Sequence, residues 1–308
     1  FSSAAAERGM NMICGHSGEL TSMAFSPDGR LAAYGGYNEG FRVPTAVELT
    51  CADPGDPCAL PVAFVADPPL EPVISRTLEL GLRGRAFDAV RWNAGLFMTQ
   101  LKDDILFTST GASQGFFANV PKTRREGIEL GLASDRPGRF DWFTNYSFVR
   151  ATYRSAVDLF NGAANEADPA TPETIEVRPG DRLPGVPAHL FKAGLRWHVD
   201  DRLAVGTSMN VVASQFLRGD EANNERKLGG YAVFNLQADY RVVKGWRVFG
   251  RVNNAFDRRY ASLGAYNRVA FNGQSEPLEG VGPGPVTRFV SPGMPRTWWF
   301  GVAYQPGG

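Results

Sequence analysis

The 308-residue sequence has no run of roughly 18 apolar residues, the length that a hydrophobic helix needs to cross a bilayer. A membrane-spanning helix is therefore excluded. The chain also has no charge excess, because 32 Lys and Arg residues balance 32 Asp and Glu residues. A general nucleic-acid-binding protein needs a basic surface, so this class is disfavoured. Residues 1–12 lack the charged and apolar segments of a signal peptide. An initiator Met is lacking too, and we expect the chain to begin inside a longer protein.

Residues that carry catalysis or bind metals are scarce. The three histidines, His16, His189 and His198, form no His-x-x-x-His or Cys/His cluster, so the sequence indicates no metal site. Neither a Gly-x-Ser-x-Gly nucleophile motif nor a phosphate-binding glycine loop occurs. Asp103 and Asp104 adjoin a predicted loop, where solvated carboxylates are more common than catalytic ones. We therefore predict that the protein is not an enzyme and needs no cofactor.

Cysteines are also few. Cys51 and Cys58 flank ADPGDP, a stretch of turn-forming residues, and two cysteines that close a short loop favour a disulfide in an oxidising compartment. Two free thiols in the loop are the alternative. Cys14 has no evident partner.

The main signal that the sequence does contain is an alternation of apolar and polar residues with a period of two. Apolar side chains occupy every second position from Ala232 to Val242, and Asn235, Gln237 and Asp239 lie between them. The same alternation occurs in residues 77–83, 128–132, 190–199 and 297–304. Since successive side chains of a strand point to opposite faces, each segment has one apolar and one polar face. A soluble β-sandwich would share this pattern, because its outer faces are wet.

The lengths of the connections distinguish the two classes. Five short turns are predicted near residues 27–29, 88, 136–138, 200–201 and 244–245. Longer stretches lie between them, at residues 39–74, 104–115, 154–184, 219–228 and 261–291. Compact soluble domains rarely contain several long loops, whereas membrane barrels have short periplasmic turns and long outer loops. We therefore predict an all-β fold, a portion of an antiparallel up-and-down transmembrane β-barrel with about eleven long strands, short periplasmic turns and long extracellular loops.

Aromatic residues on the apolar phase support this orientation. Six of them lie near a short turn or the C-terminus and would form a girdle at the periplasmic interface: Trp92, Phe140, Trp142, Trp197, Trp246 and Tyr304. We also expect Leu195, Phe234, Leu236 and Phe300 to face lipid, and Asp141, Asn235 and Gln237 to face the lumen.

Charged residues occupy the polar phase. Facing lipid, each cation would cost about 2–4 kcal/mol near the midplane, so a wet lumen beside a plug domain is favoured. The predicted lumen-facing residues are Glu79, Arg83, Glu129, Lys192, Arg196, Asp239, Arg241, Arg247 and Arg251.

Eleven strands do not close an up-and-down barrel. The first and eleventh strands would run parallel if they paired, whereas bacterial single-chain barrels have even strand numbers. Open edges are costly in lipid, because unpaired backbone groups there find no water. We therefore expect residues 19–304 to form the C-terminal part of a larger barrel. A poorly defined segment, residues 1–18, precedes it, and a tail, residues 305–308, follows.

Six segments resemble, in the same order, motifs of the TonB-dependent outer-membrane receptors. They are GYNEGFRVPTAVEL (36–49), SRTLELGLRG (75–84), NVPKTRREGIELGL (119–132), RLPGVPAHLFKAGLRW (182–197), VNNAFDRRYAS (252–262) and PRTWWFGVAY (295–304). Each motif is weak alone, but six in order are specific. The chain departs from the family pattern in two respects. Four residues follow the closing aromatic Tyr304, and the plug domain and energy-coupling box of the family are absent.

The resemblance implies energy-dependent uptake of a scarce ligand, such as a ferric siderophore, cobalamin, haem or a sugar, across the outer membrane of a Gram-negative cell. The implied partners are outer-membrane lipid, the plug and remaining barrel, the TonB complex that acts through the plug, and a small ligand. Without a plug, we expect this chain alone to transport nothing. Outer loops would supply specificity. Their aromatic residues are candidates for ligand contact, with packing inside the loops as the alternative: Phe64, Phe116, Phe117, Phe160, Tyr266 and Phe271.

Two other functional classes stay open at this point. A passive porin or an adhesin barrel would share the alternation but not the ordered motifs. A soluble binding module of the WD-repeat type is suggested by GHSGELTSMAFSPDGRLAAYGG (15–36), which resembles one propeller blade. However, propellers repeat such a segment about every 40–45 residues, and no repeat follows. SPDGR also coincides with a predicted short turn.

Overall fold

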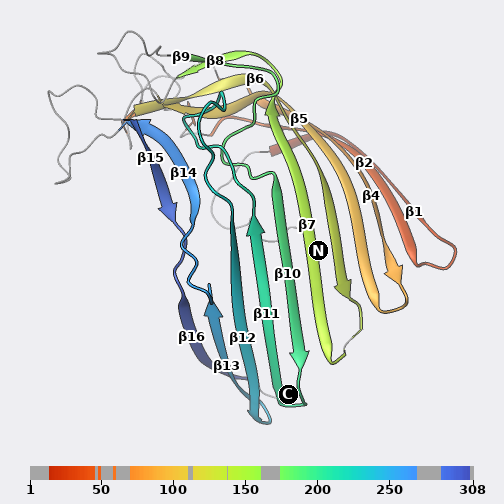
Figure 1. Cartoon of the computed structure of the whole chain (residues 1–308). Helices are drawn as coiled ribbons and strands as arrows, with labels where there is room; N and C mark the ends of the chain where they lie inside the picture. The colour runs from red at the N-terminus through yellow and green to blue at the C-terminus, as the bar shows by residue number, and fades with distance from the viewer. Residues whose placement is uncertain are drawn as a thin grey trace, which may run out of the picture.

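The protein forms one large antiparallel sheet. The structure is a computed structural model that describes residues 14–45, 48–49, 58–59, 70–109, 114–136, 138–160, 174–268 and 286–305. Eleven strands follow one another in the order β1-β2-β4-β5-β6-β7-β10-β11-β12-β13-β16, and β3 (Cys58–Ala59) pairs with β6 beside this path (Figure 1). The predicted all-β fold with about eleven antiparallel strands is thus confirmed. No helix in the described part of the chain is long and apolar enough to cross a membrane.

The strands are long. Their bounds are β1 (Cys14–Phe25), β2 (Leu31–Arg42), β4 (Val73–Ala86), β5 (Val90–Ser109), β6 (Gln114–Ser134), β7 (Phe140–Tyr153), β10 (His189–His198), β11 (Leu203–Val212), β12 (Tyr231–Val243), β13 (Trp246–Asn253) and β16 (Thr297–Tyr304). β5 and β6 have 20 and 21 residues, more than the roughly 9–11 that cross a hydrocarbon layer. β10 and β11 have 10 residues each. Gly185, at φ +75°, breaks the extended backbone before β10.

The five predicted short turns are confirmed. They join β1 to β2, β4 to β5, β6 to β7, β10 to β11 and β12 to β13, and Figure 1 shows them at the lower end of the sheet. We call this the turn end and the opposite one the loop end. Residues 15–36, which resemble a propeller blade, form most of the β1–β2 hairpin at the edge of the sheet. β1 begins at Cys14, five residues before the predicted start of the barrel segment.

Two of the long connections contain hairpins of their own. β8 (Val157–Phe160) pairs with β9 (Thr174–Val177), and β14 (Ala261–Arg268) pairs with β15 (Val286–Pro292). The prediction of a loop at residues 104–115 was wrong, because β5 and β6 continue through most of these residues and stay paired with each other. The strands lose their alternation here, since Ile105 and Val120 are buried. Sequence periodicity therefore could not identify this extension.

The buried core lies at the loop end rather than in the middle of the sheet. It comprises Val120, Ala151, Tyr153, Leu159, Val177 and Leu183. These residues come from β6, β7, the β8–β9 hairpin and the segment after it. The core therefore holds the hairpin against the ends of the strands, while most apolar residues near the turn end stay outside it.

We predict that Asp200→Ala weakens the β10–β11 turn. The Asp200 carboxylate accepts 2.7 Å hydrogen bonds from the backbone N–H groups of Arg202 and Leu203, and these bonds lower the pKa of the carboxyl group. Removing the acceptor should move the urea midpoint of unfolding to a lower concentration, as measured by tryptophan fluorescence. Asp201→Ala is the matched control. Equal midpoints for the two variants would contradict the role of Asp200.

Candidate functional site

The register of the sheet divides its side chains between two faces. Residues paired across neighbouring strands point to the same side. One row of pairs runs through Leu195, Thr207, Leu236, Val252 and Trp298. We call the side that contains this row the apolar face. The adjacent row contains Arg196, Gly206, Gln237, Arg251 and Trp299 and belongs to what we call the polar face.

The apolar face is not covered by any other described part of the chain. Leu195, Leu236 and Phe300 are 44%, 50% and 79% exposed. A soluble sheet instead buries its apolar face against a second layer. An uncovered apolar face, with charged residues on the opposite face, is typical of a transmembrane barrel.

The register groups the residues predicted from the alternation. All nine charged residues predicted for the lumen share the polar face, and Asp141, Asn235 and Gln237 lie there too. The six residues of the predicted girdle and the four others predicted to face lipid share the apolar face. The orientation of the two faces stays a prediction: the polar face is expected to face the lumen and the apolar face to face lipid.

Asp239 is the centre of an ion-pair network on the polar face. Its two carboxylate oxygens lie 3.2 Å from the guanidinium nitrogens of Arg196 and Arg247. Arg196 on β10 reaches Asp239 on β12 across β11, where Ala204 and Gly206 are the intervening polar-face residues. Their small side chains leave the path open. One carboxylate thus joins three strands.

A second contact connects β7 and β10. His198 Nε2 lies 2.7 Å from Asp141 Oδ2, with both side chains half-exposed. His198 lies in phase with Arg196 and therefore on the polar face. Within the described residues, no group of three His, Cys, Asp or Glu side chains is placed to hold a metal ion.

Glycines lie opposite aromatic rings on the polar face, and sequence inspection missed this feature. Phe143 covers Gly194, where an added Cβ would stand 2.4 Å from the ring. Phe249 covers Gly301 in the same way, at 2.3 Å. Each glycine pairs directly with its aromatic residue. The rings therefore lie flat on the sheet instead of projecting from it. The sequence did contain a signal for this feature, because aromatic residues and glycines both occur at polar-phase positions of neighbouring strands.

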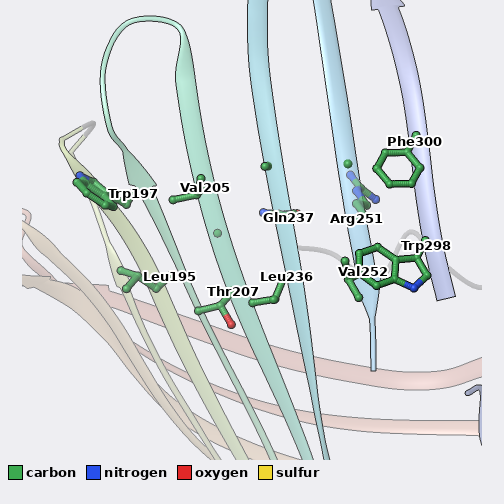
Figure 2. A pocket seen from close by; sticks show the side chains of 13 residues that line it. Leu195, Trp197, Val205, Thr207, Leu236, Gln237, Arg251, Val252, Trp298 and Phe300 are labelled. Carbon is green, nitrogen blue, oxygen red and sulfur yellow. The ribbon is translucent and has the colours of Figure 1, made fainter. Parts of the chain in front are cut away.

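The apolar face contains a shallow groove of about 540 Å³. Its floor includes the small residues Gly206, Ala238 and Gly250. Figure 2 shows Leu195 and Trp197 on one side, Trp298 and Phe300 on the other, and Leu236 between them. This surface offers apolar contact but no convergent set of catalytic groups.

The arrangement of long strands, short turns and two unlike faces matches a known family. The family model described as TonB dependent receptor-like, beta-barrel, matches residues 21–255, which is most of the chain. The chain belongs to the TonB-dependent receptor β-barrel family. Barrels of this family are outer-membrane proteins, and its named members here are receptors and transporters.

Similar proteins include a ferric-pyoverdine receptor and a pesticin receptor. The ferric-pyoverdine M114 receptor PbuA of Pseudomonas sp. (strain M114) is 25% identical over 198 residues, covering 63% of this chain and 22% of the relative. The pesticin receptor of Yersinia enterocolitica is 24% identical over 211 residues, covering 68% of this chain and 28% of the relative. The chain thus spans about a quarter of the length of these relatives.

Solved structures share the fold. The copper transporter OprC superposes with a TM-score of 0.65 at 20% identity, covering 93% of this chain and 39% of that protein. The ferric yersiniabactin uptake receptor FyuA of Yersinia pestis superposes with a TM-score of 0.62 at 20% identity, covering 93% of this chain and 36% of that protein.

The loops of this receptor barrel are joined to one another at the loop end. The side-chain amide of Asn223 accepts a 2.6 Å hydrogen bond from the backbone N–H of Arg182 and donates a 2.9 Å bond to its carbonyl. The backbone of Arg218 exchanges hydrogen bonds with Gly264 and Tyr266 of β14. The β11–β12 loop therefore contacts both the segment before β10 and the β14–β15 hairpin.

Two carboxyl groups lie within this loop, of which Asp220 is buried and Glu221 is partly buried. Burial raises the pKa of Asp220 and that of Glu221, although both accept backbone hydrogen bonds. Asp220 accepts from Asn224 and Glu225, and Glu221 accepts from Gly219. These hydrogen bonds stabilise the turn of the loop. The two carboxyl groups therefore have a structural role.

The candidate ligand contacts lie in several places. Phe64 and Phe271 fall outside the described residues. The other four were expected in loops but belong to strands. Phe116 and Phe117 lie in β6, whereas Phe160 and Tyr266 lie in β8 and β14, the hairpin strands of two long connections. Phe117 packs edge-on against Phe107 at a centroid distance of 5.1 Å, which agrees with packing among the loops. A ligand role for these residues stays a prediction.

The predicted disulfide is not decided by the structure. Cys58 begins β3 and pairs with Gly115 of β6, while Cys51 lies outside the described residues. The Cys51–Cys58 bond therefore stays a prediction.

We predict that Asp239→Asn destabilises the sheet by about 1 kcal/mol, the upper end for partly exposed ion pairs, because one carboxylate serves two arginines. Urea unfolding of the protein in lipid vesicles measures the change. Glu79→Gln is the matched control, since Glu79 shares the polar face but forms no ion pair within the described residues. A loss of the same size in both variants would show that the network around Asp239 contributes nothing.

Proposed function

We propose that the protein is part of an outer-membrane receptor that takes up a ferric siderophore, with its strands crossing the membrane many times. Family membership supports receptor and transport activity. The names of two relatives, ferric-pyoverdine receptors, support a siderophore as ligand. The energy would come from the TonB complex, through a plug domain that occupies the lumen.

The exposed apolar face is the observation that carries this proposal. Its leucines and aromatic residues alternate with charged residues that pair with one another on the other side of the same strands. Water would disfavour so much exposed apolar surface, whereas lipid favours it. The polar face then lines the lumen, where its charges are hydrated or contact the plug.

The loop end would bind the ligand. Its buried core and its hydrogen-bonded loops form a fixed rim, which suits recognition because fewer groups must become ordered on binding. Phe116, Phe117, Phe160 and Tyr266 are candidates for contact there. Uptake of this kind needs no catalytic residue, since the ligand crosses unchanged.

We predict opposite sensitivities at two adjacent positions of β12. Leu236→Arg places a cation on the apolar face and should cost about 2–4 kcal/mol in lipid vesicles. Gln237→Arg places it on the polar face and should cost far less, because water in the lumen would hydrate the cation. Unfolding free energies in vesicles of phosphatidylcholine measure both. Equal costs would contradict the assignment of the faces.

Uptake by cells tests the function itself. Gram-negative cells that express this chain together with the plug and the remaining barrel of its receptor should accumulate radioactive iron from one or more of ferric pyoverdine, ferric yersiniabactin and ferric catecholates, whereas cells that express the chain alone should accumulate none. An uncoupler of the inner-membrane proton gradient should abolish the accumulation, because transport is energy-dependent. Accumulation that persists in de-energised cells would identify a passive pore instead. Accumulation of none of these complexes would contradict the siderophore assignment.

A further inference from the structure

The apolar face carries a row of cations where its apolar residues end. Pairing across β4, β5, β6 and β7 joins Arg76 to Gln100, Gln100 to Arg124 and Arg124 to Thr152. An isolated bridge then joins Thr152 to Arg182. All five therefore point to the same side as the exposed leucines of these strands.

Two adjacent rows enlarge this set. The next row toward the loop end pairs Lys102 with Lys122, and the next row toward the turn end pairs Glu126 with Arg150. We call the six cations of the three rows the basic band: Arg76, Lys102, Lys122, Arg124, Arg150 and Arg182. Immediately below it lie the exposed Leu80, Leu96 and Ile128.

The basic band lies at the depth of a membrane interface. Ten residues separate Trp92, near the turn end of β5, from Lys102. That is roughly 33 Å along the strand, or about 25 Å at a tilt near 40°, which matches the height of the apolar band of such barrels. The cost of an outward cation falls to about 0–1 kcal/mol at this depth.

The basic band contains more cations than there are acidic side chains within ion-pair distance of it. Arg76 pairs with Glu39, Lys102 with Asp103, and Arg124 with Glu126 at the long distance of 3.8 Å. Lys122, Arg150 and Arg182 have no acidic partner within ion-pair distance in the described part of the chain.

Two observations favour an anion beside the arginines of the basic band. Arg124 Nε is buried without a hydrogen-bond partner. Burial and the positive charge of Arg150 lower the pKa of Arg182, which lies in the segment between β9 and β10. Guanidinium groups placed near each other gain most from a phosphate, which can accept bonds from both.

We infer that the basic band binds the phosphate groups of lipid headgroups in the leaflet at the loop end. This inference rests on the proposed membrane location. Lipid is the occupant that the surroundings favour, because acyl chains of the same molecule would lie against Leu80, Leu96 and Ile128 directly below the cations. A free anion would make no use of these exposed side chains.

Lipid binding to the folded 308-residue chain in zwitterionic detergent micelles tests this. Dioleoyl phosphatidic acid, which carries a phosphomonoester, is titrated against dioleoyl phosphatidylcholine, and bound lipid is counted by native mass spectrometry. The chain should prefer phosphatidic acid. The double variant Lys122→Gln/Arg150→Gln should lose about thirtyfold in affinity for phosphatidic acid, the effect of two interfacial cations.

The matched control is Arg83→Gln/Lys192→Gln, which removes the same charge from the polar face and should leave phosphatidic acid binding unchanged. Lys122 and Arg150 are exposed and unpaired among the described side chains, so their variant should fold. Equal losses in both variants, or equal binding of the two lipids by the unmodified chain, would overturn the inference alone. Competition by millimolar inorganic phosphate would assign the site to a free anion and also overturn it. Failure of the chain to associate with micelles or vesicles of any composition would contradict the membrane location as well.

Discussion

Backbone hydrogen bonding between neighbouring antiparallel strands is the constraint on which the rest of this structure depends. Every strand from β1 to β16 in the main sheet pairs with the next along its length, as a sheet in lipid requires because no water is present to satisfy its backbone. Once the pairing is fixed, the register decides the direction of each side chain. A shift of one residue would exchange the two faces completely.

The two faces of the sheet have different side chains and suit different surroundings. On the apolar face, many leucines and aromatic residues, such as Leu80, Leu236 and Phe300, stay exposed unless lipid covers them. The polar face lowers the cost of its charges by pairing them across strands, with Asp239 shared between two arginines. Small residues make this possible: Gly206 leaves space for Arg196 to reach across β11, and Gly194 lets Phe143 lie on the sheet.

Stability is distributed unevenly along the strands. The conventional buried core is confined to the loop end, where β6, β7 and the β8–β9 hairpin enclose Val120, Tyr153 and Val177. Hydrogen bonds of Asn223 and Arg218 join the loops there. A rim stabilised by its own core can vary in sequence without disturbing the strands below, which depend on pairing and on their surroundings. This separation suits a family in which the barrel is common and the ligands differ.

The sequence by itself determined the strand pattern and the assignment to faces. Alternation around Leu236 and Gln237 depends only on the two-residue period of a strand, and turn residues such as Asp200 act locally, so both were predictable. The tertiary structure alone decided what lies beyond the alternation. Residues 104–115 were mistaken for a loop, because burial on both sides of β5 and β6 erases the period. The contact of Arg196 with Asp239, and the row from Arg76 to Arg182, join residues far apart in the chain. Only the register of several successive strands brings such residues together, and no local property of the sequence contains it.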